Sequence, residues 1–473
     1  MKQQISIHWF KQDLRLQDNP SINYLSEKEE KTLFIYILDN SSDSLSLGSA
    51  SKVWLHHSLK YLNKQLNGKL LIFNDSAINV FKKLIQDFRI SSISWNRCYD
   101  QASIKKDAKI KIFLKKHIDD VQSFNGSLLW EPWEILKNDG TPFKVFTPFY
   151  KNGCLAKPLP RKPLTKKIKI CDSKYSTNKI SILQLNTENK WASKITNEWK
   201  IGEEFAHEAM NSFFKLGISN YREGRNFPSK PNVSKLSPFI HWGQISPNTL
   251  WWKCNENNKS QNHENINTFK SELGWREFSY YLLFHFPHIT EKNLQVKFDN
   301  FEWEFNEIYF KRWTKGQTGY PIVDAGMREL WETGYMHNRV RMIVGSFLVK
   351  NLLIHWKKGE RWFWDCLFDA DIASNSASWQ WVAGTGADAA PYFRIFNPVT
   401  QGQKFDPDGE YTKKYVPELR KFPLKYLFNP WDCPENISKN IEFEIGKHYP
   451  NPIVNLKESR EKALKVFTSL KKM

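Results

Sequence analysis

The sequence lacks the marks of several large classes of protein. Its six cysteines are scattered, with no CxxC pair and no cysteine–histidine cluster at zinc-ligand spacing, which argues against a structural zinc site and against a disulfide framework. It has no run of about 18 apolar residues, and its first residues enter an apolar alternation without the apolar core of a signal peptide. We therefore expect no metal, no membrane span and a cytoplasmic location.

Acidic residues are too few to balance the basic ones. Over 473 residues, 69 Lys and Arg face 50 Asp and Glu, a formal net charge of +19. An excess of this size favours a polyanionic partner, most simply nucleic acid, although a basic surface that only aids solubility would give the same count. The 20 tryptophans and 33 phenylalanines are large side chains that serve packing, stacking or electron transfer.

Two kinds of periodicity divide the chain. Residues 1–130 alternate short β-type runs with helical patterns, which predicts an α/β domain with a doubly wound parallel sheet. The predicted strands are Ile5–Phe10, Thr32–Leu38, Lys69–Phe73, Ile93–Trp95 and Val121–Phe124. No glycine-rich phosphate loop opens the helices between them, so the usual dinucleotide fingerprint is missing.

The rest of the chain is a connector followed by helices. Residues 131–200 are rich in proline and lysine, including Lys166-Lys167, which is typical of an interdomain connection. Residues 201–473 are almost wholly helical in pattern. The helices predicted there include Ile266–Phe286, His337–His355 and Trp362–Leu367.

The stretch Asp369–Trp381 combines small residues, two carboxylates two positions apart and the amide of Asn375. Small side chains let a backbone approach a flat ligand closely, as a largely apolar cofactor site with a few placed polar groups requires. The alternative is a packed helix–loop with an exposed acidic turn. Arg341 is a plausible partner for one of the two carboxylates, and it shares a helical face with Asn338 and Met342.

Two further groups suggest ligand contacts. Glu272 and Trp275 lie three residues apart, so on a helix they share a face that can read and stack on a nucleobase, although a core tryptophan beside an ion-paired glutamate fits equally. The segments 221–228 and 233–238 offer hydroxyls and cations, and a serine before a helix can bind phosphate. Helix capping by Ser237 is the alternative.

Four segments, in this order, resemble signatures of the DNA photolyase/cryptochrome family over essentially the whole chain, with the match closest to class I cyclobutane pyrimidine dimer photolyases. They are Trp275–Phe278, Thr318–Ala325, Met336–Met342 and Pro391–Pro398. The resemblance implies a C-terminal all-helical FAD-binding domain. It also implies that light-excited reduced FAD passes an electron to a dimer flipped out of UV-damaged DNA, which splits the cyclobutane ring before the electron returns.

The resemblance also assigns residues. Glu272, Asn338 and Asn375 match catalytic positions, with Glu272 hydrogen-bonded to the dimer and Asn375 facing the flavin N5. The flavin contacts it implies are Tyr221, Ser234, Leu236, Ser237, Arg276, Asn338, Arg341, Asp369, Asp371 and Asn375. The residues it implies for the lesion and DNA are Arg225, Glu272, Trp275, Arg339, Met342, Trp381 and Arg394, and those for electron transfer are Trp379, Trp356 and Trp303.

Alternatives within the family remain open. A (6-4) photolyase is expected to carry a histidine pair where this chain has Asn338 and Met342, and a plant-type cryptochrome photoreceptor usually has aspartate in place of Asn375. A second, antenna chromophore is possible but of unknown identity, and folate is not expected because Ala102-Ser103 stands where folate-type members carry Asn-Glu. We expect a monomer, associated with the nucleoid in a bacterial cell.

Overall fold

The computed structural model describes residues 3–39, 46–165, 168–171, 180–185, 190–258, 260–389, 391–392 and 394–470. Its packing divides into two compact units. Unit 1 is Met1–Ser219 with Ser234–Pro287, and unit 2 is Asn220–Val233 with His288–Met473. The domain boundaries expected at residues 130 and 200 stay a prediction.

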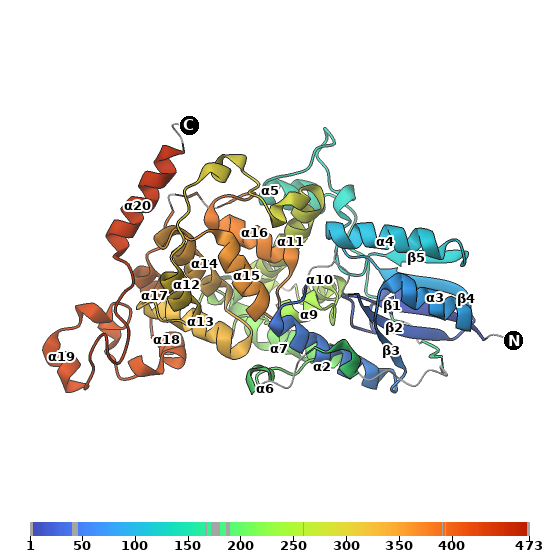
Figure 1. Ribbon diagram of the computed structural model, residues 1–473, viewed down its shortest axis with the longest axis horizontal. Helices are drawn as coiled ribbons and strands as arrows, with labels where there is room; N and C mark the ends of the chain where they lie inside the picture. The colour runs from blue at the N-terminus through green and yellow to red at the C-terminus, as the bar shows by residue number, and fades with distance from the viewer. Residues whose placement is uncertain are drawn as a thin grey trace. The chain divides into compact units, whose positions relative to one another are not determined.

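Unit 1 begins with five parallel strands in one sheet, in the order β3-β2-β1-β4-β5 (Figure 1). They are β1 (Gln4–Phe10), β2 (Thr32–Leu38), β3 (Leu70–Asn74), β4 (Arg89–Asn96) and β5 (Asp120–Phe124). Every predicted strand is present, although β4 starts at Arg89 rather than Ile93. The strand order reverses between β1 and β4, which confirms the doubly wound sheet.

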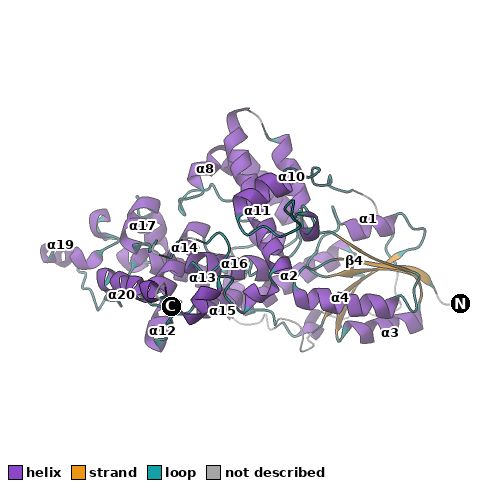
Figure 2. Cartoon of the chain, turned by 90° about the horizontal axis from the view of Figure 1, so that it is seen from above, coloured by secondary structure: helices purple, strands orange, loops and turns teal. Residues whose placement is uncertain are grey.

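Helices cover both faces of this sheet. They are α1 (Pro20–Ser26), α2 (Ser49–Gln65), α3 (Ala77–Asp87) and α4 (Gln101–Leu114). Figure 2 shows α1 on one face of the sheet and α3 and α4 on the other. Side chains alternate along β1, so that Ile7 and Trp9 join Phe81 of α3 and Leu114 of α4 in one apolar core.

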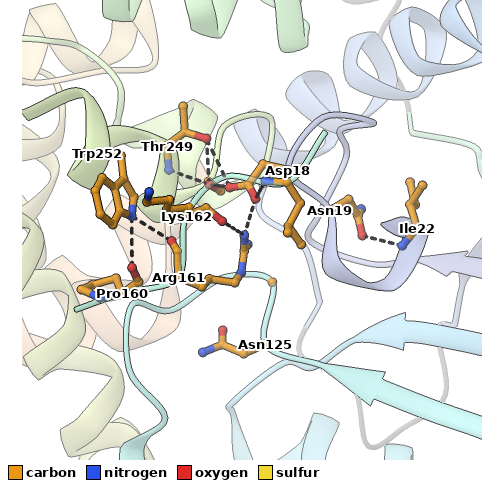
Figure 3. Close-up of polar contacts among 12 residues, drawn as sticks. Asp18, Asn19, Ile22, Asn125, Pro160, Arg161, Lys162, Thr249 and Trp252 are labelled. Carbon is orange, nitrogen blue, oxygen red and sulfur yellow. Dashed lines mark hydrogen bonds and ion pairs between the residues drawn. The ribbon is translucent and has the colours of Figure 1, made fainter. Parts of the chain in front are cut away.

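The connector is tied to the loop after β1 through Asp18 (Figure 3). The Asp18 carboxylate accepts a hydrogen bond from the Leu164 amide at 2.9 Å and pairs with Arg161. It also accepts bonds from the hydroxyls of Ser246 and Thr249. Because Asp18 is buried, these donors replace the water that its charge loses on folding, and they hold the end of the proline-rich segment in place.

The other elements that the structure describes in unit 1 are helices. Its longest helix, α11 (His263–His285), confirms the helix predicted over Ile266–Phe286. The others are η1 (Pro132–Glu134), α5 (Phe146–Pro148), η2 (Phe149–Cys154), η3 (Ile180–Leu183), α6 (Lys190–Thr196), α7 (Glu203–Ser212), η4 (Phe213–Gly217), η5 (Ile218–Asn220), α9 (Ser237–His241), α10 (Pro247–Glu256) and η6 (Ser260–Asn262). Lys166-Lys167 lies outside the described residues.

Unit 2 is helical in the residues that the structure describes. A buried core of aromatic and aliphatic side chains joins α13, α14, α15 and α16. Its elements are α8 (Tyr221–Gly224), η7 (Pro287–Thr290), η8 (Val296–Asn300), α12 (Glu307–Thr314), α13 (Pro321–Thr333), α14 (Asn338–Ser346), η9 (Phe347–Asn351), α15 (Trp356–Cys366), α16 (Ile372–Ala383), α17 (Pro398–Phe405), α18 (Glu410–Tyr415), η10 (Pro417–Leu419), η11 (Leu424–Tyr426), η12 (Pro430–Asp432), α19 (Glu435–Asn440) and α20 (Leu456–Ser469).

The helix predicted over His337–His355 is interrupted, so this prediction was wrong at its C-terminal end. After α14, the helix widens into the π-helical turn η9, and Leu353 then takes a positive φ of 52°. Such a backbone conformation cannot continue a right-handed helix. His355 caps the next helix by accepting a hydrogen bond from the Lys357 amide at 3.0 Å. The helix predicted from Trp362 therefore begins earlier, at Trp356.

Candidate functional site

The stretch predicted to hold a cofactor forms the start of α16 in unit 2. Asp371 is the N-cap of this helix, and its carboxylate accepts a hydrogen bond from the Ser374 amide at 2.8 Å. Asp369 accepts a bond from the Arg341 guanidinium at 2.9 Å, and Arg341 also donates to the Met336 carbonyl at 2.7 Å. The predicted pair between an arginine and a carboxylate is therefore present, with Asp369 as the partner.

Arg341 keeps its charge in this setting. Burial by itself would lower the pKa of its guanidinium, but the Asp369 carboxylate beside it raises that pKa. The ring of Tyr335 lies 5.3 Å from the guanidinium, and burial raises the pKa of the Tyr335 phenol, which stays neutral. The result is a fixed cation whose nearest counter-charge is Asp369, suited to hold a ligand that carries partial negative charge.

The side-chain amide of Asn375 is held in one orientation. Its Nδ2 donates to the Glu360 carbonyl of α15 at 3.0 Å. The Glu360 carboxylate accepts a bond from the Ser376 hydroxyl and pairs with Lys357 at 2.6 Å. Since Asn375 is only half-buried, an amide fixed in this way can offer a ligand a hydrogen bond without first losing rotamer freedom.

Two of the three tryptophans predicted for electron transfer pack around α15. Trp379 of α16 is buried edge-on against Phe363, with ring centroids 4.9 Å apart. Gly359 leaves room for Trp379, because a Cβ at Gly359 would lie 2.2 Å from the indole ring. Trp356, one turn before Gly359, is fully buried, and its indole N–H donates to Asn293 at 2.9 Å.

The third tryptophan, Trp303, reaches Trp356 through a histidine ring. The His355 ring lies 5.1 Å from Trp303 and 5.4 Å from Trp356, measured between ring centroids. Burial, and then the charges of Lys357 and Lys358, lower the pKa of His355 to about 4, so the ring between the two indoles is neutral at pH 7. Trp303 is half-buried, and the aromatic set thus extends from a buried indole to a partly exposed one.

The N-terminal turn of α14 carries an amide, a cation and a thioether together. Asn338 is exposed at the first helical position, and Met342, one turn later, is half-buried. Arg339 donates to the side-chain oxygen of Asn226 and to the Met342 sulfur at 3.7 Å. Its guanidinium lies 4.4 Å from the Phe405 ring. This end of α14 presents the three chemical groups that the resemblance assigned to it.

A second guanidinium lies close to Arg339. Arg225 stacks over the Tyr221 ring at 5.4 Å. Burial, and then the positive charge of Arg225, lower the pKa of Arg339. Two like charges that repel in this way are stabilised by an anion placed beside them, and a phosphate group is the natural candidate.

Trp381 and Arg394 are the remaining predicted lesion or DNA contacts in unit 2. Trp381 is half-buried at the C-terminal half of α16. Arg394 is exposed, and its backbone carbonyl accepts a hydrogen bond from the Lys350 amine at 2.9 Å. Burial and the charge of Arg394 lower the pKa of Lys350 to about 8. Lys350 therefore anchors the backbone from which the Arg394 side chain extends.

Glu272 and Trp275 share one face of α11 in unit 1, as their spacing predicted, and both are half-buried. The indole of Trp275 stacks on the Phe146 ring, with centroids 3.8 Å apart and planes at 10°. We did not predict this contact, since Phe146 lies in the connector. Aromatic residues there recur at three- and four-residue spacing, which is the signal that would have indicated a packed helical turn: Phe143, Phe146, Phe149 and Tyr150.

Arg276 is bound within unit 1. Its guanidinium donates to the Ser127 carbonyl at 2.8 Å and pairs with Glu277 at 3.1 Å. Burial raises the pKa of Glu277 to about 7, although Arg276 and the amides of Leu129 and Trp130 favour its charged form. Arg276 also borders a small cavity at the carboxyl ends of β1 and β4. Its predicted flavin contact stays a prediction.

The predicted phosphate contacts of unit 1 lie around the start of α9. Leu236 is buried at the N-cap position, and its amide donates to the Ser234 hydroxyl at 3.4 Å. Ser237 is the first residue of α9 and is exposed. The N-cap residue of this helix is Leu236 rather than Ser237, and it makes no side-chain hydrogen bond at the cap; the phosphate contact predicted for Ser237 stays a prediction.

The predicted residues thus fall into two groups. Those in unit 2 lie on α8, α14, α15 and α16, in the segments that follow these helices and, for Trp303, between η8 and α12, whereas those in unit 1 lie on α11 and at the start of α9. Among the described residues, no three His, Cys, Asp or Glu side chains are grouped as metal ligands. Within the same ranges, no helix is both long enough and apolar enough to cross a membrane.

Two family models match the chain. Residues 6–165 match the model described as DNA photolyase, and residues 269–469 match the FAD binding domain of DNA photolyase. A deoxyribodipyrimidine photo-lyase of Agrobacterium fabrum is 44% identical, with 98% of each chain covered. Cryptochrome-1 of Arabidopsis thaliana is 35% identical, covering 96% of this chain and 69% of its own.

Solved structures agree in fold. A bacterial class III photolyase from Agrobacterium tumefaciens has a TM-score of 0.95 and 42% identity, covering 100% of this chain and 99% of its own. An archaeal photolyase from Sulfolobus tokodaii, solved with two FAD molecules, has a TM-score of 0.81 and 29% identity, covering 98% of this chain and 100% of its own.

Proposed function

We propose that this chain, which belongs to the DNA photolyase and cryptochrome family, repairs cyclobutane pyrimidine dimers in DNA in a light-dependent reaction. The chain is an enzyme of the photolyase type with FAD as its cofactor, as its FAD binding domain and its full-length photo-lyase relative establish. The cyclobutane dimer as the lesion, and the residue roles below, are the proposal.

The class I subclass expected from the sequence motifs is not supported. The solved photolyase that matches this chain over its whole length at 42% identity is a class III enzyme. The four motifs therefore serve to identify the family and not its class.

The residues of unit 2 fit the isoalloxazine end of FAD. Arg341 is a permanent cation held by Asp369, and Asn375 offers an oriented amide. Ala370 and Ala373 are buried beside them, which lets the backbone approach a flat ring. When bound in its reduced form, FAD supplies on light absorption the electron that splits the dimer. In this proposal Arg341 and Asn375 bind and orient the flavin ring and hold the charge distribution around it fixed.

On the substrate side, Glu272 and Trp275 supply stacking and one hydrogen bond. An indole face binds a flipped-out base by stacking, and flipping is cheapest for a damaged, poorly paired site. The carboxyl group of Glu272, one helical turn before Trp275, hydrogen-bonds the dimer and stabilises the charge that develops on it. Arg225, Arg339 and Arg394 are proposed to contact the DNA backbone and the edge of the lesion.

The choice of the cyclobutane dimer over the (6-4) photoproduct rests on one observation. The N-terminal turn of α14 presents Asn338 and Met342 to the surface, at the positions where a (6-4) photolyase would carry a histidine pair. An amide and a thioether cannot donate the proton that a histidine pair provides. They can hydrogen-bond and pack against an apolar cyclobutane dimer.

A photoreceptor role of the cryptochrome kind is the second candidate. It is favoured by the 35% identity to Arabidopsis cryptochrome-1 over nearly the whole of this chain. Retention of Asn375, Glu272 and Trp275 favours repair. A second chromophore is proposed without an assigned identity, since the Sulfolobus relative holds two FAD molecules. The monomeric state and the nucleoid association stay predictions.

The test compares two substrates. The FAD-loaded protein is reduced and illuminated with an oligonucleotide that carries one cyclobutane thymine dimer, and in parallel with one that carries a (6-4) photoproduct. We expect loss of the first lesion only, with a lower yield per absorbed photon for Glu272→Ala. Repair of the (6-4) photoproduct alone would overturn the lesion assignment, and tight dimer binding without splitting would favour the photoreceptor.

A further inference from the structure

Three rings of unit 1 form an aromatic stack, which we define as Tyr150, Phe146 and Trp275. The Phe146 ring lies between the other two, 3.8 Å from Trp275 and 5.5 Å from Tyr150, with interplanar angles of 10° in both pairs. Two of the three rings come from the connector and one from α11. The stack therefore joins segments more than a hundred residues apart at the residue proposed to receive the lesion.

The surroundings hold the aromatic stack in place. Phe278, three residues after Trp275, contacts Phe146 edge-on at 6.0 Å and Phe149 at 5.0 Å. Gly274 leaves the space that the Tyr150 ring fills, because a Cβ at Gly274 would lie 2.6 Å from that ring. Phe146 is 7% exposed, so it has few alternative rotamers open to it.

This packing leaves Trp275 one face for a ligand. At 3.8 Å, the Phe146 ring is in van der Waals contact with the indole and excludes a base from that side. Trp275 nevertheless remains half-buried rather than buried, so part of its surface is open to a ligand. A stacked ligand is bound most tightly when the platform ring is already held in its bound orientation.

We propose that Phe146 is a positioning residue: it fixes the plane of the Trp275 indole, backed by Tyr150, so that the opposite face receives the dimer. This inference rests on the proposed function, since it needs Trp275 to stack on the lesion. Phosphate contacts do not depend on the indole plane. Loss of the aromatic stack therefore weakens binding of damaged DNA more than binding of undamaged DNA.

The experiment measures dark binding of the FAD-loaded protein to two oligonucleotides that differ only in one thymine dimer. Phe146→Leu removes the ring but keeps an apolar side chain, and we expect it to weaken dimer binding about 2- to 10-fold. Binding of the undamaged oligonucleotide is expected to change by less than about twofold. Phe146→Tyr restores the ring and is expected to restore dimer affinity.

A second variant disturbs the aromatic stack at Tyr150 instead of at Phe146. Gly274→Ala places a methyl group against Tyr150 and pushes that ring away while every aromatic residue is retained. We expect the same selective loss of dimer affinity. This variant also keeps the test informative if Phe146→Leu does not fold. The absorbance of bound FAD in each purified variant reports whether that variant is folded.

The outcomes distinguish a failure of the proposed function from a failure of the positioning role of Phe146. If the unaltered protein does not prefer the dimer-containing oligonucleotide, the proposed function fails and the positioning role falls with it. If the unaltered protein prefers the dimer and both variants keep that preference, or lose affinity for both oligonucleotides equally, the positioning role alone is refuted.

Discussion

Replacing Asp369 by Asn tests the ion pair on which the flavin site of unit 2 is built. Asp369 is 5% exposed and Arg341 is 24% exposed, with 2.9 Å between their charged atoms. Removing one partner of a fully buried pair costs about 3–5 kcal/mol. Arg341 keeps its bond to the Met336 carbonyl, and Asn keeps an acceptor oxygen, so we expect a smaller loss of unfolding free energy, about 2 kcal/mol.

This loss is measurable as a thermal shift. In a domain of the size of unit 2, each kcal/mol of lost unfolding free energy lowers the midpoint temperature of thermal unfolding by about 2–4 °C. The midpoint temperature of Asp369→Asn is therefore expected to fall by about 4–8 °C. Thermal unfolding of the FAD-loaded protein is followed by circular dichroism and by the fluorescence of released FAD, with FAD in excess. We also expect Asp369→Asn to be purified with less bound FAD.

The matched control is Asp408→Asn. It is the same substitution in the same unit, at a carboxylate that is 60% exposed and lies 4.0 Å from Lys230. Exposed pairs of this kind contribute little, so its midpoint is expected to stay within about 2 °C of the unaltered protein. If Asp369→Asn unfolds at the temperature of the Asp408→Asn control and retains the same FAD, the reasoning about the Arg341–Asp369 pair is refuted.

Three further predictions follow from the site. Burial raises the pKa of Glu277 to about 7 from a usual value of 4.5, so the folded state holds a proton that the unfolded state releases between pH 4.5 and 7, and stability falls as the pH rises through that window. Urea unfolding curves of the unaltered protein are expected to show a loss of about 2 kcal/mol of unfolding free energy between pH 5 and pH 7, and Glu277→Gln is expected to remove that loss; an equal loss in the variant would count against this reasoning. Trp379→Phe is expected to slow photoreduction of oxidised FAD while chemically reduced enzyme still splits the dimer, as transient absorption and repair assays would report; unchanged photoreduction would exclude Trp379 from the pathway. Arg339→Ala is expected to weaken the binding of damaged and undamaged DNA alike and to reduce the slope of log affinity against log salt concentration by about 1. A loss of affinity confined to damaged DNA would place Arg339 at the lesion instead.

The sheet and most helices were predictable because their signals are local. Strands such as Thr32–Leu38 show continuous β-branched and aromatic runs, and Asn19 before Pro20 marks the start of α1, where its side chain accepts a bond from the Ile22 amide. The break after η9 was not predictable. Nothing in the apolar pattern from His337 to His355 marks Leu353 as the residue that takes a positive φ, and tertiary packing decides it.

The site was predictable where chemistry constrains the partner. A largely buried arginine needs a carboxylate, which pointed from Arg341 to either Asp369 or Asp371, and the structure shows the bond to Asp369, 28 residues along the sequence. The stacking of Phe146 on Trp275 could not be predicted in this way, since an aromatic ring packs on many partners. The bond of Arg276 to the Ser127 carbonyl was missed because nothing in the sequence marks one backbone carbonyl as an acceptor, and its ion pair with Glu277 was missed as well.

The measurement that tests the central claim most directly is the loss of thymine dimers from a UV-irradiated oligothymidine in light and in the dark. The protein is loaded with reduced FAD, and restored thymine absorbance is followed under near-UV or blue light, with Glu272→Ala in parallel. The account predicts restoration only in light, at a lower rate for the variant. If the protein holds fully reduced FAD and binds the dimer, but the dimer survives illumination, the account is contradicted.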